Sequence, residues 1–282
     1  MFSRYLAAPF AIAALVFLYL TWEVDPAYSL YIVPPVIAIV LILVFAPQLD
    51  WWWYQKKPPQ LPIPLQQMLD RFLPFFRTLD QAQKKRFIDR VALFNIGVEY
   101  MPQNMEDIPE DVKVMLAAQA VQLTFNQEDM LLGRYERLII YPHPFPTPQH
   151  QEHWHTSETY AEDGVFLFAL EQVARGFVQQ DKFFQIGTYE FAKAYLELYP
   201  ADRDLEISLE EWPQIEQIFG ANPELITAWV GLPKEAFDPT AALISLYFSK
   251  PASVKQHWPE KASILESMFA PQVIAPTSTS TT

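Results

Sequence analysis

The order of apolar and polar positions divides the chain into two unequal parts. Two apolar runs, at about residues 5–21 and 30–47, open the sequence, and Glu23 and Asp25 are the charges between them. Each run approaches the ~20 residues that cross a hydrocarbon layer of ~30 Å. A cleaved signal peptide is the alternative for the first run, but a second run follows at once and no small-residue cleavage site separates them. We therefore expect a two-helix transmembrane hairpin.

The flanking charges predict the orientation of this hairpin. Arg4 precedes the first run, Lys56 and Lys57 follow the second, and the connecting loop is acidic. By the positive-inside rule, both outer ends face the cytoplasm. The aromatic tract at residues 51–54 lies where an interfacial belt is expected. The lipid bilayer is thus the partner predicted for residues 5–47.

Composition marks further boundaries after the hairpin. Residues 57–64 are dense in proline and predict a linker between a membrane anchor at 1–56 and a globular domain at 65–270. Residues 271–282, which end in Pro-Thr-Ser-Thr-Ser-Thr-Thr, predict a disordered tail. A hydrophobic content of 51% supplies enough apolar side chains for a domain of ordinary size.

Within the domain, apolar stripes of helical period outnumber β-like runs. Thr78 and Gln81 predict a capping box at the start of one helix. Short strands are expected at 137–141 and 165–169. Helices are expected at residues 65–76, 80–94, 109–125, 184–198, 209–219, 240–248 and 252–269. Because the strands come in one block, the pattern favours an α+β fold, mostly helical with a small sheet.

Charge and composition exclude several classes of function. The formal net charge of −13 argues against nucleic-acid partners, which require Lys and Arg to neutralise phosphates. Without cysteine, the chain has no disulfide, thiolate nucleophile or Cys-based metal site. With seven glycines and no glycine-rich phosphate loop, nucleotide binding through such a loop is not expected.

One expected helix carries a chemically suggestive spacing. Tyr189 and Lys193 are four residues apart and share a helix face, with Glu190 beside them. H-E-x-x-H has this layout, in which two imidazoles hold zinc and the glutamate is a general base. On spacing alone, an ordinary amphipathic turn is the simpler interpretation. Tyr189 and Lys193 also match the Tyr/Lys pair of short-chain dehydrogenases, whose glycine-rich nucleotide loop is missing from this sequence.

Several further motifs occur in the order found in the Mlc titration factor A (MtfA-like) zinc peptidase family, which the soluble domain resembles. Leu116–Ala120 resembles the family's helix before its first strand, and Leu138–Pro142 with Phe145 resembles that strand. Gly164–Phe168 with Gly176 resembles its edge strand. Tyr189–Lys193 resembles its active-site helix, and Tyr247–Pro251 the helix that supplies the third ligand. The resemblance implies a zincin-like fold with a zinc cofactor. It also implies a bacterial inner membrane, with the soluble domain facing the cytoplasm.

The same resemblance exposes departures from the family pattern. Tyr189 and Lys193 fall on the two histidine positions, Asp238 on that of the glutamate ligand, and Gly231 on that of a tyrosine assisting the transition state. Glu190 alone keeps its identity, as a vestigial general base. Because a tight zinc site needs three protein ligands, no metal is expected. Lys193 is instead predicted to pair with Asp238, with Glu190 as a further acid.

The resemblance therefore implies a catalytically inactive, membrane-anchored homologue of a zinc metallopeptidase that binds a peptide or protein partner. The alternative is an active zinc-dependent peptidase with an unconventional site that uses Glu190, Asp238 and a histidine-rich loop. That loop is more simply a solvated segment. Its weak candidate ligands are His150, His153 and His155, with His143 nearby.

Overall fold

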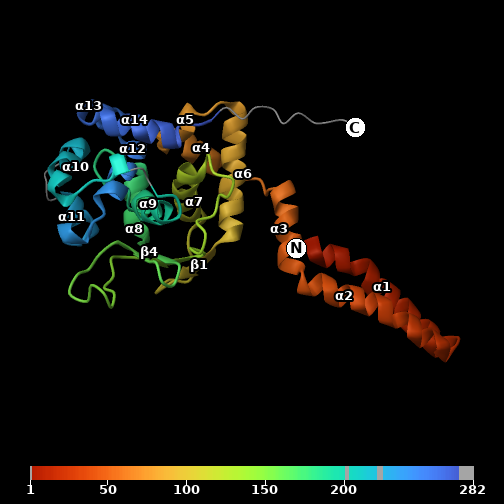
Figure 1. The fold of residues 1–282 in the computed structure, drawn as a ribbon. Helices are drawn as coiled ribbons and strands as arrows, with labels where there is room; N and C mark the ends of the chain where they lie inside the picture. Colours follow the sequence, from red (N-terminus) through yellow and green to blue (C-terminus); the bar gives the residue numbers. More distant parts are fainter. Residues whose placement is uncertain (1, 201–202, 221–224, 273–282) are drawn as a thin grey trace. The chain divides into compact units, whose positions relative to one another are not determined.

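The chain divides into two compact units, Met1–Pro59 and Gln60–Thr282. The computed structural model describes residues 2–200, 203–220 and 225–272 (Figure 1). The break between the units falls inside the proline-rich stretch that was expected to be a linker. All but the first two residues of the expected disordered tail lie outside the described residues.

The first unit is built around two apolar helical segments. Helix α1 (Phe2–Glu23) runs beside the second segment, which consists of η1 (Pro26–Ile32) and α2 (Val33–Val44) (Figure 1). By length and composition both could cross a membrane, with mean hydropathies of 1.8 for Phe2–Glu23 and 2.4 for Pro26–Val44. The second segment begins and ends a few residues before the expected run.

The aromatic tract after these segments is helical. It belongs to α3 (Ala46–Lys56), which packs against the start of α1. The Trp53 ring stacks on Phe2 with centroids 4.3 Å apart, and the Ser3 backbone N–H donates to Asp50 Oδ1 at 2.7 Å. Lys56 Nζ lies 4.2 Å from the centroid of the Trp52 ring, a cation–π contact.

The second unit contains one small mixed sheet. Its strands are β1 (Glu99–Pro102), β2 (Arg137–Tyr141), β3 (Ser157–Tyr160) and β4 (Val165–Ala169), in the order β1-β2-β4-β3. The pairs β1/β2 and β2/β4 are parallel, whereas β3/β4 is antiparallel. The expectation that Gly164–Phe168 forms the edge strand is wrong, because β4 pairs on both sides and β3 forms that edge. All five β4 residues are buried, as an interior strand requires.

Helices surround this sheet and make up most of the unit, which confirms the expected mostly helical α+β fold. Their bounds are α4 (Ile63–Phe72), α5 (Pro74–Thr78), α6 (Gln81–Gly97), α7 (Glu110–Thr124), α8 (Leu170–Val178), α9 (Ile186–Leu198), α10 (Trp212–Phe219), α11 (Leu225–Val230), α12 (Pro239–Ser249), α13 (Pro251–His257) and α14 (Pro259–Phe269), with short 3-10 turns η2 (Arg203–Leu205), η3 (Leu209–Glu211) and η4 (Lys234–Ala236).

Prolines account for the main differences between expected and observed helices. Pro74 opens α5 and Pro259 opens α14, so two expected single helices are each divided. A proline fits the first turn of a helix but cannot donate in its interior. For the same reason α4 starts at Ile63 with Pro64 in its first turn, inside the expected linker at 57–64.

The capping box before α6 uses a different pair from the one expected. Asp80 Oδ1 accepts from the Gln83 backbone N–H at 2.8 Å, and Gln83 Oε1 accepts from the Asp80 N–H at 3.0 Å. Thr78 instead donates its hydroxyl to the Phe75 carbonyl at the end of α5. Thr78 belongs to the preceding helix, which excludes it from the N-cap position.

Helix α9 lies at the centre of the second unit. It packs against α7 and α12 and also contacts β3 and β4 (Figure 1). Phe191 is fully buried and meets the Phe166 ring edge-on, with centroids 4.8 Å apart. The candidate motif at residues 189–193 is therefore held rigidly between the sheet and two core helices.

Candidate functional site

The carboxylate of Glu190 is the centre of the candidate site. Its side chain is 1% exposed and points from α9 towards the edge strand β3. The hydroxyls of Ser157 and Thr159 donate to Oε1 at 2.8 Å and Oε2 at 2.6 Å. The Lys193 ammonium, one helical turn along, donates to Oε2 at 2.8 Å. Three donors therefore hold both oxygens of a fully buried carboxylate.

Tyr189, at the first histidine position, is part of the core. Its ring lies between Phe184 and Phe237, with centroid separations of 5.6 and 5.7 Å. Its hydroxyl oxygen accepts from the Asp238 backbone N–H at 3.0 Å. Burial, with the nearby charge of Glu190, raises the pKa of Tyr189 well above its ordinary value. The phenol is neutral and ties α9 to the start of α12.

Asp238 does not form the expected ion pair with Lys193. It is the N-cap of α12, and its Oδ1 accepts from the Ala241 backbone N–H at 3.0 Å. Pro239 in the first turn favours this arrangement, because its fixed φ suits a helix start. In the described part of the chain, the ion pair of Lys193 is with Glu190, as the second half of that prediction allowed.

A small cavity opens beside these groups. Its volume is about 200 Å³, below the roughly 300–1,000 Å³ of most small-molecule pockets. Its lining includes the polar side chains of Thr159, Glu190 and Lys193 and the apolar side chains of Leu232 and Phe237. The space suits one side chain better than a whole ligand.

Of the three candidate ligands in the histidine-rich loop, His150 and His155 come together, with ring centroids 5.5 Å apart. His155 is fully buried; its Nε2 lies 3.0 Å from Glu158 Oε2 and its Nδ1 lies 3.0 Å from the His153 carbonyl oxygen. His153 is exposed. His150 lines the cavity beside Glu190. Within residues 2–200, 203–220 and 225–272, no three His, Asp or Glu side chains are grouped so as to hold a metal ion.

The donors at the family's ligand positions do not fit zinc. A structural or catalytic zinc site uses neutral imidazoles, thiolates or carboxylates. Here the candidate donors are a neutral phenol bonded to a backbone N–H, an ammonium, and a carboxylate that caps a helix. Lys193 brings a positive charge in place of a donor, and Glu190 already balances that charge. The side chains thus satisfy one another without a metal.

Gly231, which the resemblance places at the position of the family's tyrosine, is enclosed by backbone. Its φ is +83°, and a Cβ built there would lie 2.1 Å from the Trp154 carbonyl oxygen. The Thr156 N–H donates to the Val230 carbonyl at 2.9 Å, which holds the two segments together. A side chain at 231 is therefore excluded by both conformation and space.

We expect Gly231→Ala to lower the free energy of unfolding by roughly 3 kcal/mol, because left-handed strain of about 1–3 kcal/mol is joined by a backbone clash. Gly220→Ala is the matched control: φ is +73°, but no atom lies within 4 Å of the built Cβ. That variant should lose roughly 1 kcal/mol, from strain alone. Urea unfolding measures both losses, and equal losses would contradict the enclosed geometry of Gly231.

Protonation of Glu158 is expected to lower the free energy of unfolding in acid. Its burial acts to raise the pKa, but the hydrogen bond from His155 and the charges of His155 and His150 outweigh this and lower the pKa of Glu158 below 4.5. Such a carboxylate stabilises the fold above its unfolded pKa, and the contribution disappears as the pH falls through the folded value. We expect Glu158→Gln to flatten the acid decline in unfolding free energy below about pH 4.5. Glu162→Gln, at an exposed position in the same hairpin, is the control and should keep the full acid decline in unfolding free energy.

Sequence reasoning missed Ser157 and Thr159, because it missed β3. A signal was present: Asp163–Gly164 is a hairpin dipeptide directly before the recognised strand, and Gly164 has φ +62°. The polar run Thr156–Tyr160 ahead of it pairs antiparallel with β4. The hydroxyls that hold Glu190 follow from this hairpin.

Comparison with known proteins bears on the fold and family of the chain. No curated protein matches it. Residues 49–194 match the family described as glucose-regulated metallo-peptidase M90. The match covers more than half of the chain and includes Tyr189–Lys193, while Asp238 lies beyond it. It confirms the resemblance to MtfA-like peptidases, and the chain belongs to the glucose-regulated metallo-peptidase M90 family.

Proposed function

We propose that this chain is a membrane-anchored, catalytically inactive member of its family, and that its peptidase-like domain binds a peptide or protein segment. The observation that carries the proposal is the state of Glu190. Ser157, Thr159 and Lys193 together occupy both oxygens of the carboxylate that the family uses as a general base. A general base must have a free oxygen within reach of the proton that it abstracts.

The remaining family positions support loss of catalysis. Tyr189 and Asp238 bond to backbone groups of the α9–α12 junction. Gly231 excludes the transition-state tyrosine by its enclosed backbone. Each position has acquired a structural contact in place of a catalytic one, so no single substitution restores the chemistry.

The binding proposal rests on β3 and the cavity beside it. In the described part of the chain, β3 pairs with β4 and no strand covers its other edge. An extended peptide can add to such an edge through main-chain hydrogen bonds. The cavity of about 200 Å³ would accept one side chain of that peptide. The flanking charges favour a domain that faces the cytoplasm, and the family resemblance favours the inner membrane of a bacterium.

The first test is an assay of the full-length protein for cleavage of a peptide library, with and without a chelator. We expect no chelator-sensitive cleavage from the natural chain. Cleavage that is lost both on chelation and in Glu190→Gln would overturn the proposal of inactivity. Zinc measured in the same preparation shows whether metal accompanies any activity.

The second test addresses binding. Peptides selected from the library by the natural chain should bind Glu190→Gln with nearly unchanged affinity, because Glu190 makes no free contact with a ligand. Leu232→Arg, which fills the cavity, should reduce binding at least tenfold. Equal binding by Leu232→Arg would place the peptide elsewhere.

One observation favours a second candidate function, an active zinc-dependent peptidase with an unconventional site. His150 lines the same cavity as Glu190. Such an enzyme would have to break the contacts that hold Glu190, Asp238 and His155. If the cleavage assay gives activity, His150→Ala separates this candidate from contamination, since only a true site loses activity in that variant.

A further inference from the structure

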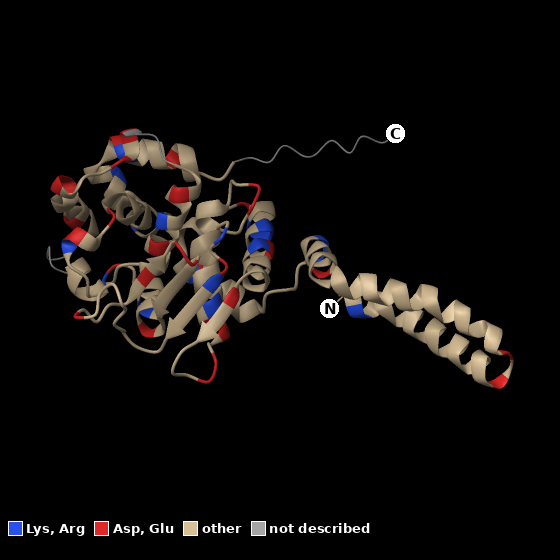
Figure 2. Cartoon of the chain, turned by 60° about the horizontal axis from the view of Figure 1, so that its bottom comes forward, with Lys and Arg blue, Asp and Glu red and all other residues tan. Residues whose placement is uncertain are grey.

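The segment that follows the apolar helices carries a charge opposite to that of the rest of the chain. Residues 56–90 contain eight of the 20 Lys and Arg but three of the 33 Asp and Glu, a net charge of +5 against −18 for the remainder. Arg90 is buried and does not contribute to the surface. Figure 2 shows Lys and Arg gathered on α6, whereas Asp and Glu spread over the C-terminal helices.

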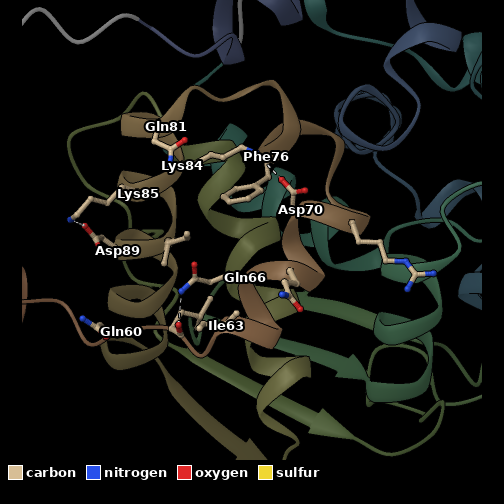
Figure 3. Close-up of a pocket in the computed structure, with 13 residues that line it drawn as sticks. Gln60, Ile63, Gln66, Asp70, Phe76, Gln81, Lys84, Lys85 and Asp89 are labelled. Carbon is tan, nitrogen blue, oxygen red and sulfur yellow. Dashed lines mark hydrogen bonds and ion pairs between the residues drawn. The ribbon is translucent and has the colours of Figure 1, made fainter.

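Residues 60–89 of this basic segment contribute the lining of a large open groove in the second unit. The groove, of about 950 Å³, lies between α4 and α6 (Figure 3). Its apolar lining includes Leu61, Phe76 and Ile88, and Ile63 at one end is 69% exposed. Lys84 and Lys85 project from α6 at its rim.

The rim lysines are available to other partners. Lys84 Nζ lies 2.7 Å from Asp70 Oδ1, and Lys85 Nζ lies 2.8 Å from Asp89 Oδ2 (Figure 3). Each pair has at least one largely exposed member, and exposed pairs contribute little to stability. Phosphate groups can therefore replace these carboxylates without loss of the fold.

Chain length limits how far the groove can lie from the anchor. Residues 57–62 separate α3 from α4, and Gln60 already lines the groove. Six residues of proline-rich chain span about 20 Å at most. A surface tethered this closely meets the bilayer at high effective concentration, so individually weak contacts suffice.

We infer that the α4–α6 groove rests on the anionic headgroups of the bilayer that holds the hairpin. The inference depends on the membrane anchoring proposed above. The basic segment would attract the negatively charged leaflet, and the acidic remainder would be repelled by it. Ile63 and the apolar lining would enter the interfacial layer, while the β3 edge stays free for a partner.

The test uses the absence of native cysteine in the full chain. Gln81→Cys, on the groove rim, and Glu210→Cys, an exposed position on η3, are each labelled with a fluorophore. The protein is placed, one chain per disc, in nanodiscs of phosphatidylcholine alone or mixed with phosphatidylglycerol, with a quencher attached to the lipid headgroups. We expect quenching of the Gln81→Cys label in the anionic discs, its loss at high salt, and no quenching of the Glu210→Cys label.

Charge reversal provides the matched comparison. Lys84→Glu with Lys85→Glu should abolish the quenching, whereas Lys182→Glu with Lys255→Glu, the same change at exposed positions outside the groove, should leave it intact. Thermal unfolding verifies that both double variants remain folded.

Equal quenching in zwitterionic discs, or in the Lys84/Lys85 variant, overturns the inference. The inference is also overturned if the Gln81→Cys label is shielded from water but is not reached by the lipid quencher. That result would indicate a protein in the groove. Alkaline extraction of native membranes distinguishes failure of the membrane anchoring from failure of the groove docking. A chain released from native membranes contradicts the anchoring itself, while an embedded chain without quenching contradicts only the docking of the groove.

Discussion

Tyr189→His combined with Lys193→His is expected to raise the zinc affinity of the chain. The two positions lie one turn apart on α9, next to Glu190. The Tyr189 hydroxyl accepts from the backbone N–H of Asp238, whose carboxylate would have to leave its N-cap contact to become the third ligand. Two imidazoles and a carboxylate complete the three protein ligands of a catalytic zinc site. Because even second-shell changes alter affinity by roughly 10–100-fold, we expect zinc affinity to rise by at least about 100-fold.

Native mass spectrometry and competition with a chelator measure this change. Tyr189→Phe with Lys193→Gln is the matched control, since it removes the phenol and the ammonium without adding imidazoles, and it should remain free of zinc. If the histidine variant is folded but binds no zinc, the assignment of α9 as the former metal helix is wrong. Peptidase activity should not return, because Gly231 cannot accept the missing tyrosine.

Glu190→Ala is expected to lower the free energy of unfolding by about 3 kcal/mol, the lower end of the cost of removing one partner from a buried ion pair. The lower end applies because the Lys193 side chain is 29% exposed and can reach water. Ser157 and Thr159 also lose their acceptor, so β3 is released from α9. Urea unfolding of the purified domain or full chain measures the loss.

A double-mutant cycle of Glu190 and Lys193 measures how much of this loss in unfolding free energy comes from their ion pair. Lys193→Ala alone should cost less than Glu190→Ala, since it leaves a carboxylate that still accepts from two hydroxyls. The two changes together should cost less than their sum, by an interaction energy of roughly 1 kcal/mol or more. A Glu190→Ala variant as stable as the parent would show that the carboxylate is retained for another reason, of which catalysis is the first to test.

The sequence predicted the backbone elements best where the side-chain pattern is local and strong. The expected strands at 137–141 and 165–169 agree with β2 and β4, and the expected helix at 109–125 agrees with α7 to one residue at each end. Strands β1 and β3 were missed because each has four residues and neither forms a continuous apolar run. Such strands depend on pairing with a neighbour that the local sequence does not reveal.

The candidate site, too, was predictable from the sequence only where the relevant residues are close together in the chain. The identities of Tyr189, Glu190 and Lys193, and their shared helix face, could be read directly from the spacing of the residues. Their partners could not, because Ser157 and Thr159 come from a strand about 30 positions earlier and Asp238 from a helix start far along the chain. The predicted Lys193–Asp238 pair failed for a physical reason: Pro239 makes Asp238 an N-cap, and Glu190 lies one turn from Lys193 on the same helix.

By itself the sequence determined two apolar segments of membrane-spanning length, a mostly helical domain, and a Tyr-Glu-x-x-Lys motif where the resemblance implies His-Glu-x-x-His. These follow from hydropathy, helical period and residue type, which are properties of short stretches of chain. Only the tertiary structure decided the partners of these side chains: a buried carboxylate is held by two hydroxyls and an ammonium, and a tyrosine is bonded to the start of α12. A buried polar group must find its partners wherever the fold places them, and those partners are distant in sequence.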